Sequence, residues 1–261
     1  MEKQEILKKI HEEELKLLKK CIDVCEKNNI PYFALGGTLL GAVRHKGFIP
    51  WDDDIDLGIP RSSYRQLIEL LNDDNVVIEK NVINLNVLQY KKKDKVIIGN
   101  KSYEIYIDLF PLDGTPNNKL LRNIFLSKFV FYRTLYKLSI VNQLNIVDRG
   151  FVGNSIVWLM KMIGISKLLP TEQIVEKIHS IAETYDFESS TYVGNILGRY
   201  RKKEIVDKTI FGSGIKLDFE ELQLNCPEVF DSYLKHIYGD YMKLTKEEDR
   251  VAHFEELNVQ G

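Results

Sequence analysis

Four aspartates fall within five positions of this chain, and two of them flank one apolar residue. They lie in Trp51-Asp52-Asp53-Asp54-Ile55-Asp56-Leu57, at the start of a predicted strand over 55–59. Side chains alternate along a strand, so Asp54 and Asp56 point to the same face. Neighbouring carboxylates repel each other unless a cation lies between them, and oxygen ligands suit Mg²⁺ or Mn²⁺. The pattern predicts a divalent metal site on Asp54 and Asp56.

A glycine pair precedes the aspartates, in Leu35-Gly36-Gly37-Thr38. It follows a predicted strand over 32–35 and precedes a short helix from Thr38 to Arg44, which Thr38 can cap. Glycines between a strand and a helix let backbone N–H groups approach a phosphate. We therefore expect Gly36, Gly37 and Thr38 to contact substrate. Taken singly, the glycine pair is also typical of an ordinary turn, and the aspartate run of a solvated acidic turn.

A third carboxylate, Asp108, ends the β-rich region 76–110 within Ile107-Asp108-Leu109. A carboxylate brought in from a separate strand completes a second metal site or takes the proton from an attacking hydroxyl. The sequence leaves both roles open, together with a structural role in capping the turn that follows.

The periodicity predicts an amphipathic helix over 2–28, a strand, helix, strand and helix up to residue 71, and strands over 76–110. A turn follows in the Pro- and Gly-rich stretch 111–116. Beyond it we expect helices over 118–185, short strands over 191–225 and helix over 227–257. The turn divides the chain into a catalytic core, 1–116, and a mainly helical lobe with short strands, 117–261, that partly completes the active site.

Charge and composition exclude some partners and compartments. The net charge of −2 gives no general basic field, so we expect no nucleic-acid partner. The amino terminus lacks the apolar stretch of a secretory signal, and charges interrupt every apolar run, so a cytoplasmic protein without a spanning helix is expected.

The order hydrophobic-Gly-Gly, spacer, Asp-hydrophobic-Asp and a later strand carboxylate resembles the nucleotidyltransferase superfamily, which has the polymerase-β-like fold. The spacer from Gly37 to Asp54 is longer than usual there. With this insertion, residues 38–60 resemble the LicD family, which includes bacterial phosphocholine transferases and fukutin-related ribitol-phosphate transferases. Residues 108–116 and Tyr238-Gly239-Asp240-Tyr241-Met242 fit the same family.

The resemblance implies an α/β (α+β) fold with a nucleotidyltransferase-type mixed-sheet core and an appended helical lobe. It implies an enzyme that transfers a phospho-alcohol group, such as phosphocholine or ribitol or glycerol phosphate, from a CDP-linked alcohol to a sugar hydroxyl. The acceptor is a cell-surface glycan or its lipid-linked oligosaccharide precursor, and CMP is released. Asp54, Asp56 and Asp108 are the implied catalytic and metal-binding residues. Which alcohol and which sugar are used stays open.

Basic residues lie just before the aspartates, and Arg44 and Lys46 could bind the donor phosphates or else neutralise nearby carboxylates. His253 lies in a stretch that resembles a His-bearing segment of the family, with no assigned role. Two alternatives remain: a nucleotidyltransferase that uses a nucleoside triphosphate and releases pyrophosphate, and a non-catalytic binding protein with the same fold.

Residues 118–170 carry eight Lys or Arg and one acid, Asp148, among many large apolar residues. Basic residues beside large apolar ones suit helices that lie on an anionic membrane surface, here the inner face of the cell membrane. The alternative is that the apolar residues pack inside a helical lobe while the cations are solvated.

Overall fold

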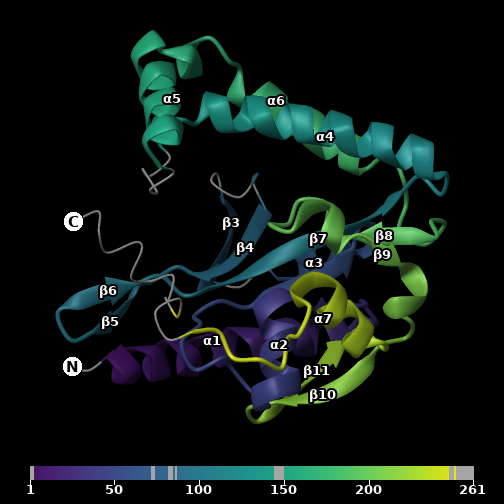
Figure 1. The fold of residues 1–261 in the computed structure, drawn as a ribbon. Coiled ribbons are helices and arrows are strands. Elements are labelled where there is room, and N and C mark those ends of the chain that lie inside the picture. The colour runs from purple at the N-terminus through teal and green to yellow at the C-terminus, as the bar shows by residue number, and fades with distance from the viewer. Residues whose placement is uncertain are drawn as a thin grey trace.

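A mixed β-sheet runs through the molecule, with helices above and below it (Figure 1). The computed structural model describes residues 3–71, 74–81, 85, 87–143, 150–246 and 250. The sheet has the order β1-β2-β7-β4-β3, with β8 paired to β7 and β9 paired to β8. Its strands are β1 (Phe33–Ala34), β2 (Asp56–Pro60), β3 (Val76–Asn81), β4 (Val87–Lys92), β7 (Tyr106–Thr115), β8 (Tyr192–Gly194) and β9 (Val206–Asp207).

The pairing of β2 with β7 is parallel, and the other pairings in the sheet are antiparallel. The expected mixed-sheet α/β architecture is thereby confirmed. Two hairpins lie off this sheet: β5 (Val96–Ile98) with β6 (Lys101–Tyr103), and β10 (Ile215–Phe219) with β11 (Leu222–Cys226).

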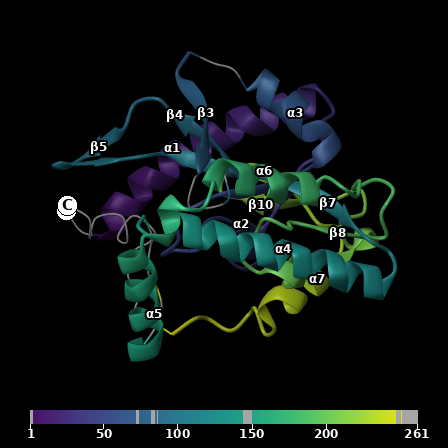
Figure 2. The same ribbon diagram turned by 90° about the horizontal axis from the view of Figure 1, so that it is seen from above.

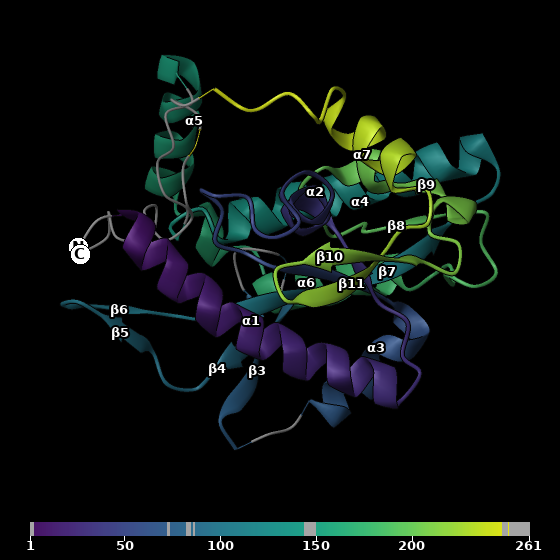
Figure 3. The ribbon, with the colours of Figure 1, turned by 90° about the horizontal axis from the view of Figure 1, so that it is seen from below.

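Below the sheet lie α1 (Lys3–Lys27) and α2 (Gly36–His45), together with the β10–β11 hairpin (Figure 3). The helix expected over 2–28 is confirmed as α1, which buries Leu18, Cys21 and Cys25 completely. These side chains recur at three- and four-residue spacing, so one face of the helix joins the core. α7 (Phe230–Tyr238) buries Tyr233, Leu234 and Ile237.

Above the sheet, α4 (Lys119–Ser139) and α6 (Thr171–Ala182) lie side by side, and α5 (Gly150–Ile163) stands at their end (Figures 1 and 2). The Asn118 side chain caps α4 by accepting from the backbone N–H groups of Leu120 and Leu121. The helices expected over 118–185 are confirmed. The other helical elements are α3 (Arg61–Leu70) and the 3₁₀ turns η1 (Ile165–Lys167), η2 (Arg201–Glu204) and η3 (Lys208–Ile210).

The turn predicted over 111–116 is wrong, because β7 continues as a strand to Thr115. Pairing explains the difference: Pro111 lies opposite Ile59 of β2, and Asp113 opposite Gly194 of β8. Gly114 serves close packing rather than a turn, since a Cβ atom there would lie 2.2 Å from Ser190 Oγ. Strand pairing thus crosses residue 116, and the division into 1–116 and 117–261 stays a prediction.

The helix predicted over 227–257 is too long. α7 ends at Tyr238, where Gly239 takes a positive φ of 73°, and residues 239–246 are not helical. Among the helices that the structure describes, none has the length and apolar character needed to cross a membrane.

Candidate active site

Two of the predicted carboxylates lie side by side on neighbouring strands. Asp56, the first residue of β2, is in register with Asp108 of β7, and Asp108 is in register with Gln89 of β4. Residues in register share a face of the sheet. Gln89 Nε2 donates to Asp108 Oδ1 at 2.8 Å, which fixes the orientation of the Asp108 carboxylate.

The remaining carboxylates gather at the first turn of α2. A Cβ atom on Gly36 would lie 2.8 Å from Asp56 Oδ2, and a Cβ atom on Gly37 would lie 2.6 Å from Asp52 Oδ2 and 3.9 Å from Asp54 Oδ1. Gly36 also takes a positive φ of 51°. Only glycine therefore lets the turn approach the carboxylates this closely. The structure brings Asp54, Asp56 and both glycines together.

Thr38 ties α2 to the acidic strand. The expected capping role is wrong: α2 begins at Gly36, and its N-cap residue, Leu35, makes no side-chain cap. Instead the buried Thr38 hydroxyl accepts from the backbone N–H of Asp56 at 2.8 Å. Leu35 N also donates to the Asp56 carbonyl, at 3.0 Å. Thr38 thus positions Asp56, and its contact with substrate stays a prediction.

The carboxylates of this cluster repel one another. Burial, followed by the charges of Asp54 and Asp108, raises the pKa of Asp56 well above its ordinary value. A divalent cation would relieve this repulsion, and a set of carboxylate oxygens suits Mg²⁺ or Mn²⁺ in type and charge. In their present positions, no three His, Cys, Asp or Glu side chains of the described residues converge well enough to hold an ion. The donor atoms suit a hard cation in type and charge, and a bound metal stays a prediction.

Arg44 and Lys46 lie at the other end of α2. Eight residues separate Gly36 from Arg44, a rise of about 12 Å along a helix. Arg44 Nη1 donates to the Tyr241 carbonyl at 2.9 Å, and its Nε donates to His45 Nε2 at 2.9 Å. Lys46 is exposed and ends the helix with a φ of 56°. Their binding of donor phosphates stays a prediction. His253 lies outside the described residues.

Tyr238, which the sequence places in a family-like stretch but not among the site residues, reaches the acidic cluster from the end of α7. Its hydroxyl oxygen lies 3.9 Å from the Cβ position of Gly36. The Tyr200 ring packs edge-on against it, with centroids 5.3 Å apart. Burial, then Tyr200 and Asp56, raise the pKa of Tyr238. Its hydroxyl is thus a neutral donor beside Asp56. The sequence signal that could have placed Tyr238 in the site is its position in the family-like stretch Tyr238-Gly239-Asp240.

Glu14, on α1, is a second residue that the sequence does not single out. It is 2 % exposed, and its Oε2 has no hydrogen-bond partner among the residues that the structure describes. Burial, then the charges of Asp53 and Asp54, raise its pKa well above the ordinary value. One turn earlier, His11 Nε2 donates to the Asp52 carbonyl at 2.7 Å. This face of α1 therefore closes the acidic cluster from behind.

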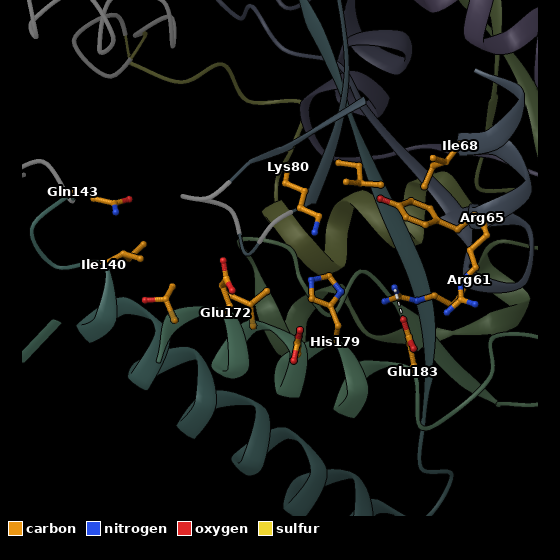
Figure 4. Close-up of a pocket in the computed structure, with 14 residues that line it drawn as sticks. Arg61, Arg65, Ile68, Lys80, Ile140, Gln143, Glu172, His179 and Glu183 are labelled. Atoms are coloured by element: carbon orange, nitrogen blue, oxygen red, sulfur yellow. Dashed lines mark hydrogen bonds and ion pairs between the residues drawn. The ribbon is translucent and has the colours of Figure 1, made fainter. Parts of the chain in front are cut away.

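A cavity of ≈ 950 Å³ lies on the opposite face of the sheet (Figure 4). Leu88, which lines it, is in register with Leu109, and each directly neighbours a member of the Gln89–Asp108 pair. Alternation along a strand places the cavity across the sheet from Asp108. Arg61, Lys80 and His179 line this cavity, so it is separate from the carboxylate cluster.

Residues 29–145 match the nucleotidyltransferase domain described as LicD/FKTN/FKRP. The chain therefore carries a LicD-family domain over these residues. It is 28% identical over 247 residues to the lipopolysaccharide cholinephosphotransferase LicD of Haemophilus influenzae, covering 88% of this chain and 89% of that protein. A shorter match, 53% over 38 residues, relates it to the human ribitol 5-phosphate transferase FKRP, covering 15% of this chain and 8% of FKRP. An uncharacterized protein of Rickettsia typhi is 36% identical over 94 residues, covering 35% of this chain and 27% of that protein.

Proposed function

We propose that this protein transfers a phospho-alcohol group from a CDP-linked alcohol to a sugar hydroxyl of a cell-surface glycan or its lipid-linked precursor, releasing CMP. The proposal includes a polymerase-β-like nucleotidyltransferase core and a requirement for Mg²⁺ or Mn²⁺. The carrying observation is the pairing of Asp56 with Asp108 beside the glycine turn of α2. The relatives support it, since one is a cholinephosphotransferase and another a ribitol 5-phosphate transferase.

In the proposed reaction, the acceptor hydroxyl oxygen bonds to the phosphorus that carries the alcohol. The bond from that phosphorus to the bridging oxygen breaks, and CMP leaves with the electron pair. Asp54 and Asp56 would hold the divalent cation, which neutralises charge on the phosphate oxygens. Asp108 either joins the cation or accepts the hydroxyl proton. Gln89 keeps its carboxylate oriented for both roles.

The α2 turn and Tyr238 would receive the diphosphate. Backbone N–H groups of Gly36 and Gly37 begin the helix, where partial positive charge favours phosphate. The Tyr238 hydroxyl lies beside the same turn and can donate to a phosphate oxygen.

CMP release from a panel of CDP-alcohols tests the proposal. The protein is incubated with CDP-choline, CDP-ribitol or CDP-glycerol, an oligosaccharide acceptor and Mg²⁺, and separately with CTP. We expect CMP from at least one CDP-alcohol and no pyrophosphate from CTP.

Asp56→Asn should lower the rate at least about a hundredfold. Asp218→Asn, an exposed carboxylate on β10, is the matched control and should change little. Pyrophosphate release from CTP would favour a strict nucleotidyltransferase. If Asp56→Asn releases CMP, or pyrophosphate, as fast as the wild type does, the reaction takes place at another site.

A further inference from the structure

Large apolar side chains lie exposed on α4, on α5 and at Leu168 just after η1, far more densely than on the rest of the described surface. On α5, none of the side chains that the structure describes is buried, and Trp158 is 64% exposed. A helix this apolar normally buries a face against a partner. The exposed side chains are Leu120, Leu121, Ile124, Val130, Phe131, Ile156, Trp158, Leu159, Met162, Ile163 and Leu168.

On α4 the apolar residues form a stripe with a lysine inside it. Leu120, Ile124 and Phe131 recur at four- and seven-residue spacing, so they share one face of the helix. Lys128 continues the same spacing between Ile124 and Phe131 and is exposed. The side chains that join the core, Phe125 and Phe129, lie on another face. The stripe is therefore not the face that holds α4 in the fold.

The charge on these three elements has one sign. α4, α5 and η1 carry seven Lys or Arg and no Asp or Glu, although the whole chain is −2. The charged side chains of the neighbouring helix α6 (Thr171–Ala182) are divided in the same way. Glu172 and Glu176 line the cavity on the sheet side, whereas Lys177 lines a hollow against α4. An apolar surface with cations at its edge complements a bilayer that contains anionic lipid.

A hollow between α4 and α6 lies beside this surface. It has a volume of ≈ 550 Å³ and is lined by Ser127, Lys128, Phe131, Tyr132, Lys177 and Ile181. The hollow thus has two lysines and two aromatic rings in its lining, beside the exposed stripe of α4. A lipid phosphate could lie between the ammonium groups while its chains contact Phe131.

We propose that α5 and the outer face of α4 dock on the surface of an anionic bilayer, with a lipid headgroup in the hollow between Lys128 and Lys177. The surface lies on the helical layer, away from the hairpin β5–β6 (Figures 1 and 2). It is independent of the proposed transfer reaction, so binding and catalysis are measured separately.

Vesicle flotation of the whole protein tests the proposal. With vesicles of equal parts phosphatidylglycerol and phosphatidylcholine, we expect the protein to float at low and at physiological salt, and less with phosphatidylcholine alone. Lys128→Gln and Lys177→Gln should each weaken binding to the anionic vesicles about fivefold. The double variant Leu159→Glu, Met162→Glu should abolish flotation. Ile97→Glu, on the β5–β6 hairpin and 77% exposed in the wild type, is the matched control and should float normally.

Tryptophan fluorescence provides a second readout, because the chain has two tryptophans, Trp51 and Trp158. In Trp51→Phe, emission comes from Trp158 alone and should move to shorter wavelength when anionic vesicles are added. A wild-type protein that stays unbound at both salt concentrations overturns the proposal. So does a lipid-free dimer, seen by sedimentation, that Leu159→Glu, Met162→Glu turns into a monomer, since the occupant would then be a second copy of this chain.

Discussion

At the scale of single residues, the glycine turn of α2 links backbone conformation to the carboxylates. Gly36→Ala would place a Cβ atom 2.8 Å from Asp56 Oδ2 and strain a φ of 51°. We expect at least a tenfold loss of CMP release, about 1.4 kcal/mol in the barrier, because Asp56 must move. Gly164→Ala is a matched control: its φ of 69° carries similar strain, but nothing lies within 4 Å of its Cβ position. Both variants should lose about 1 kcal/mol of stability, and only Gly36→Ala should lose activity. Equal activity losses would contradict a specific role for Gly36.

A buried glutamate near the site predicts how stability depends on pH. Burial raises the pKa of Glu204 from 4.5 to about 7, and Oε1 accepts from Tyr200 N at 3.3 Å. Tyr200 and Arg133 act on its ionisation, and its own charge acts on Tyr233 and Asp56. The pKa of Glu204 is higher in the folded than in the unfolded state. Ionisation of Glu204 therefore lowers the free energy of unfolding as the pH rises from about 4.5 to 7, by up to about 3 kcal/mol.

Glu204→Gln removes that cost and keeps an oxygen for Tyr200 N. Relative to the wild type, the variant should therefore gain about 2 to 3 kcal/mol between pH 4.5 and pH 8. Urea unfolding in the presence of a chelator measures this change, with exposed Glu221→Gln as the control. A constant difference between variant and wild type across this pH range would show that Glu204 titrates near its ordinary value in the folded state.

At the scale of elements, an ion pair joins α3 to β7. Arg61 Nε and Nη2 donate to Asp113 Oδ1 and Oδ2 at 2.7 and 2.6 Å, and the Asp113 side chain is fully buried. Asp113→Ala leaves a mostly buried guanidinium whose remaining ion-pair partner among the described residues is Glu183, at 3.3 Å. The variant should lower the free energy of unfolding by about 3 to 5 kcal/mol. Glu183→Ala removes the more exposed carboxylate and should change it by less than about 1 kcal/mol. Denaturant unfolding of the two variants measures the contrast. Similar losses of unfolding free energy in Asp113→Ala and Glu183→Ala would mean that burial does not determine how strongly each carboxylate stabilises Arg61.

Local pattern predicted the elements near the site better than those that depend on pairing. The spacing of apolar residues identified α1, the region 118–185 is helical as expected, and the alternation around Asp56 identified β2. By contrast, Pro111 to Pro116 has the composition of a turn, but β2 and β8 hold it as a strand. Tyr238 and Glu14 reach the carboxylates from helices that are far away in the sequence. A local sequence pattern does not predict such long-range contacts.

At the scale of the whole molecule, the carboxylate cluster should make stability depend on a divalent cation. Asp52, Asp54, Asp56 and Asp108 come from two strands and the segment before β2, so an ion that joins them links parts that separate on unfolding. Binding to the folded state alone adds about 2.7 kcal/mol at a concentration a hundredfold above Kd, equivalent to roughly 5 to 10 °C in Tm for a chain of this size. We therefore expect Mg²⁺ or Mn²⁺ to raise Tm in thermal unfolding and a chelator to reverse the change.

The response of Tm in variants separates this site from a general salt effect. Asp56→Asn removes one ligand and reduces the repulsion, so its Tm without metal should rise while its shift with Mg²⁺ shrinks. Asp218→Asn, on the exposed face of β10, should keep the wild-type shift. A salt effect would instead give the same rise in all three proteins and would appear equally with NaCl at matched ionic strength. That result would contradict cation binding at the cluster, whereas a shift lost only in Asp56→Asn would place the ion beside the α2 turn.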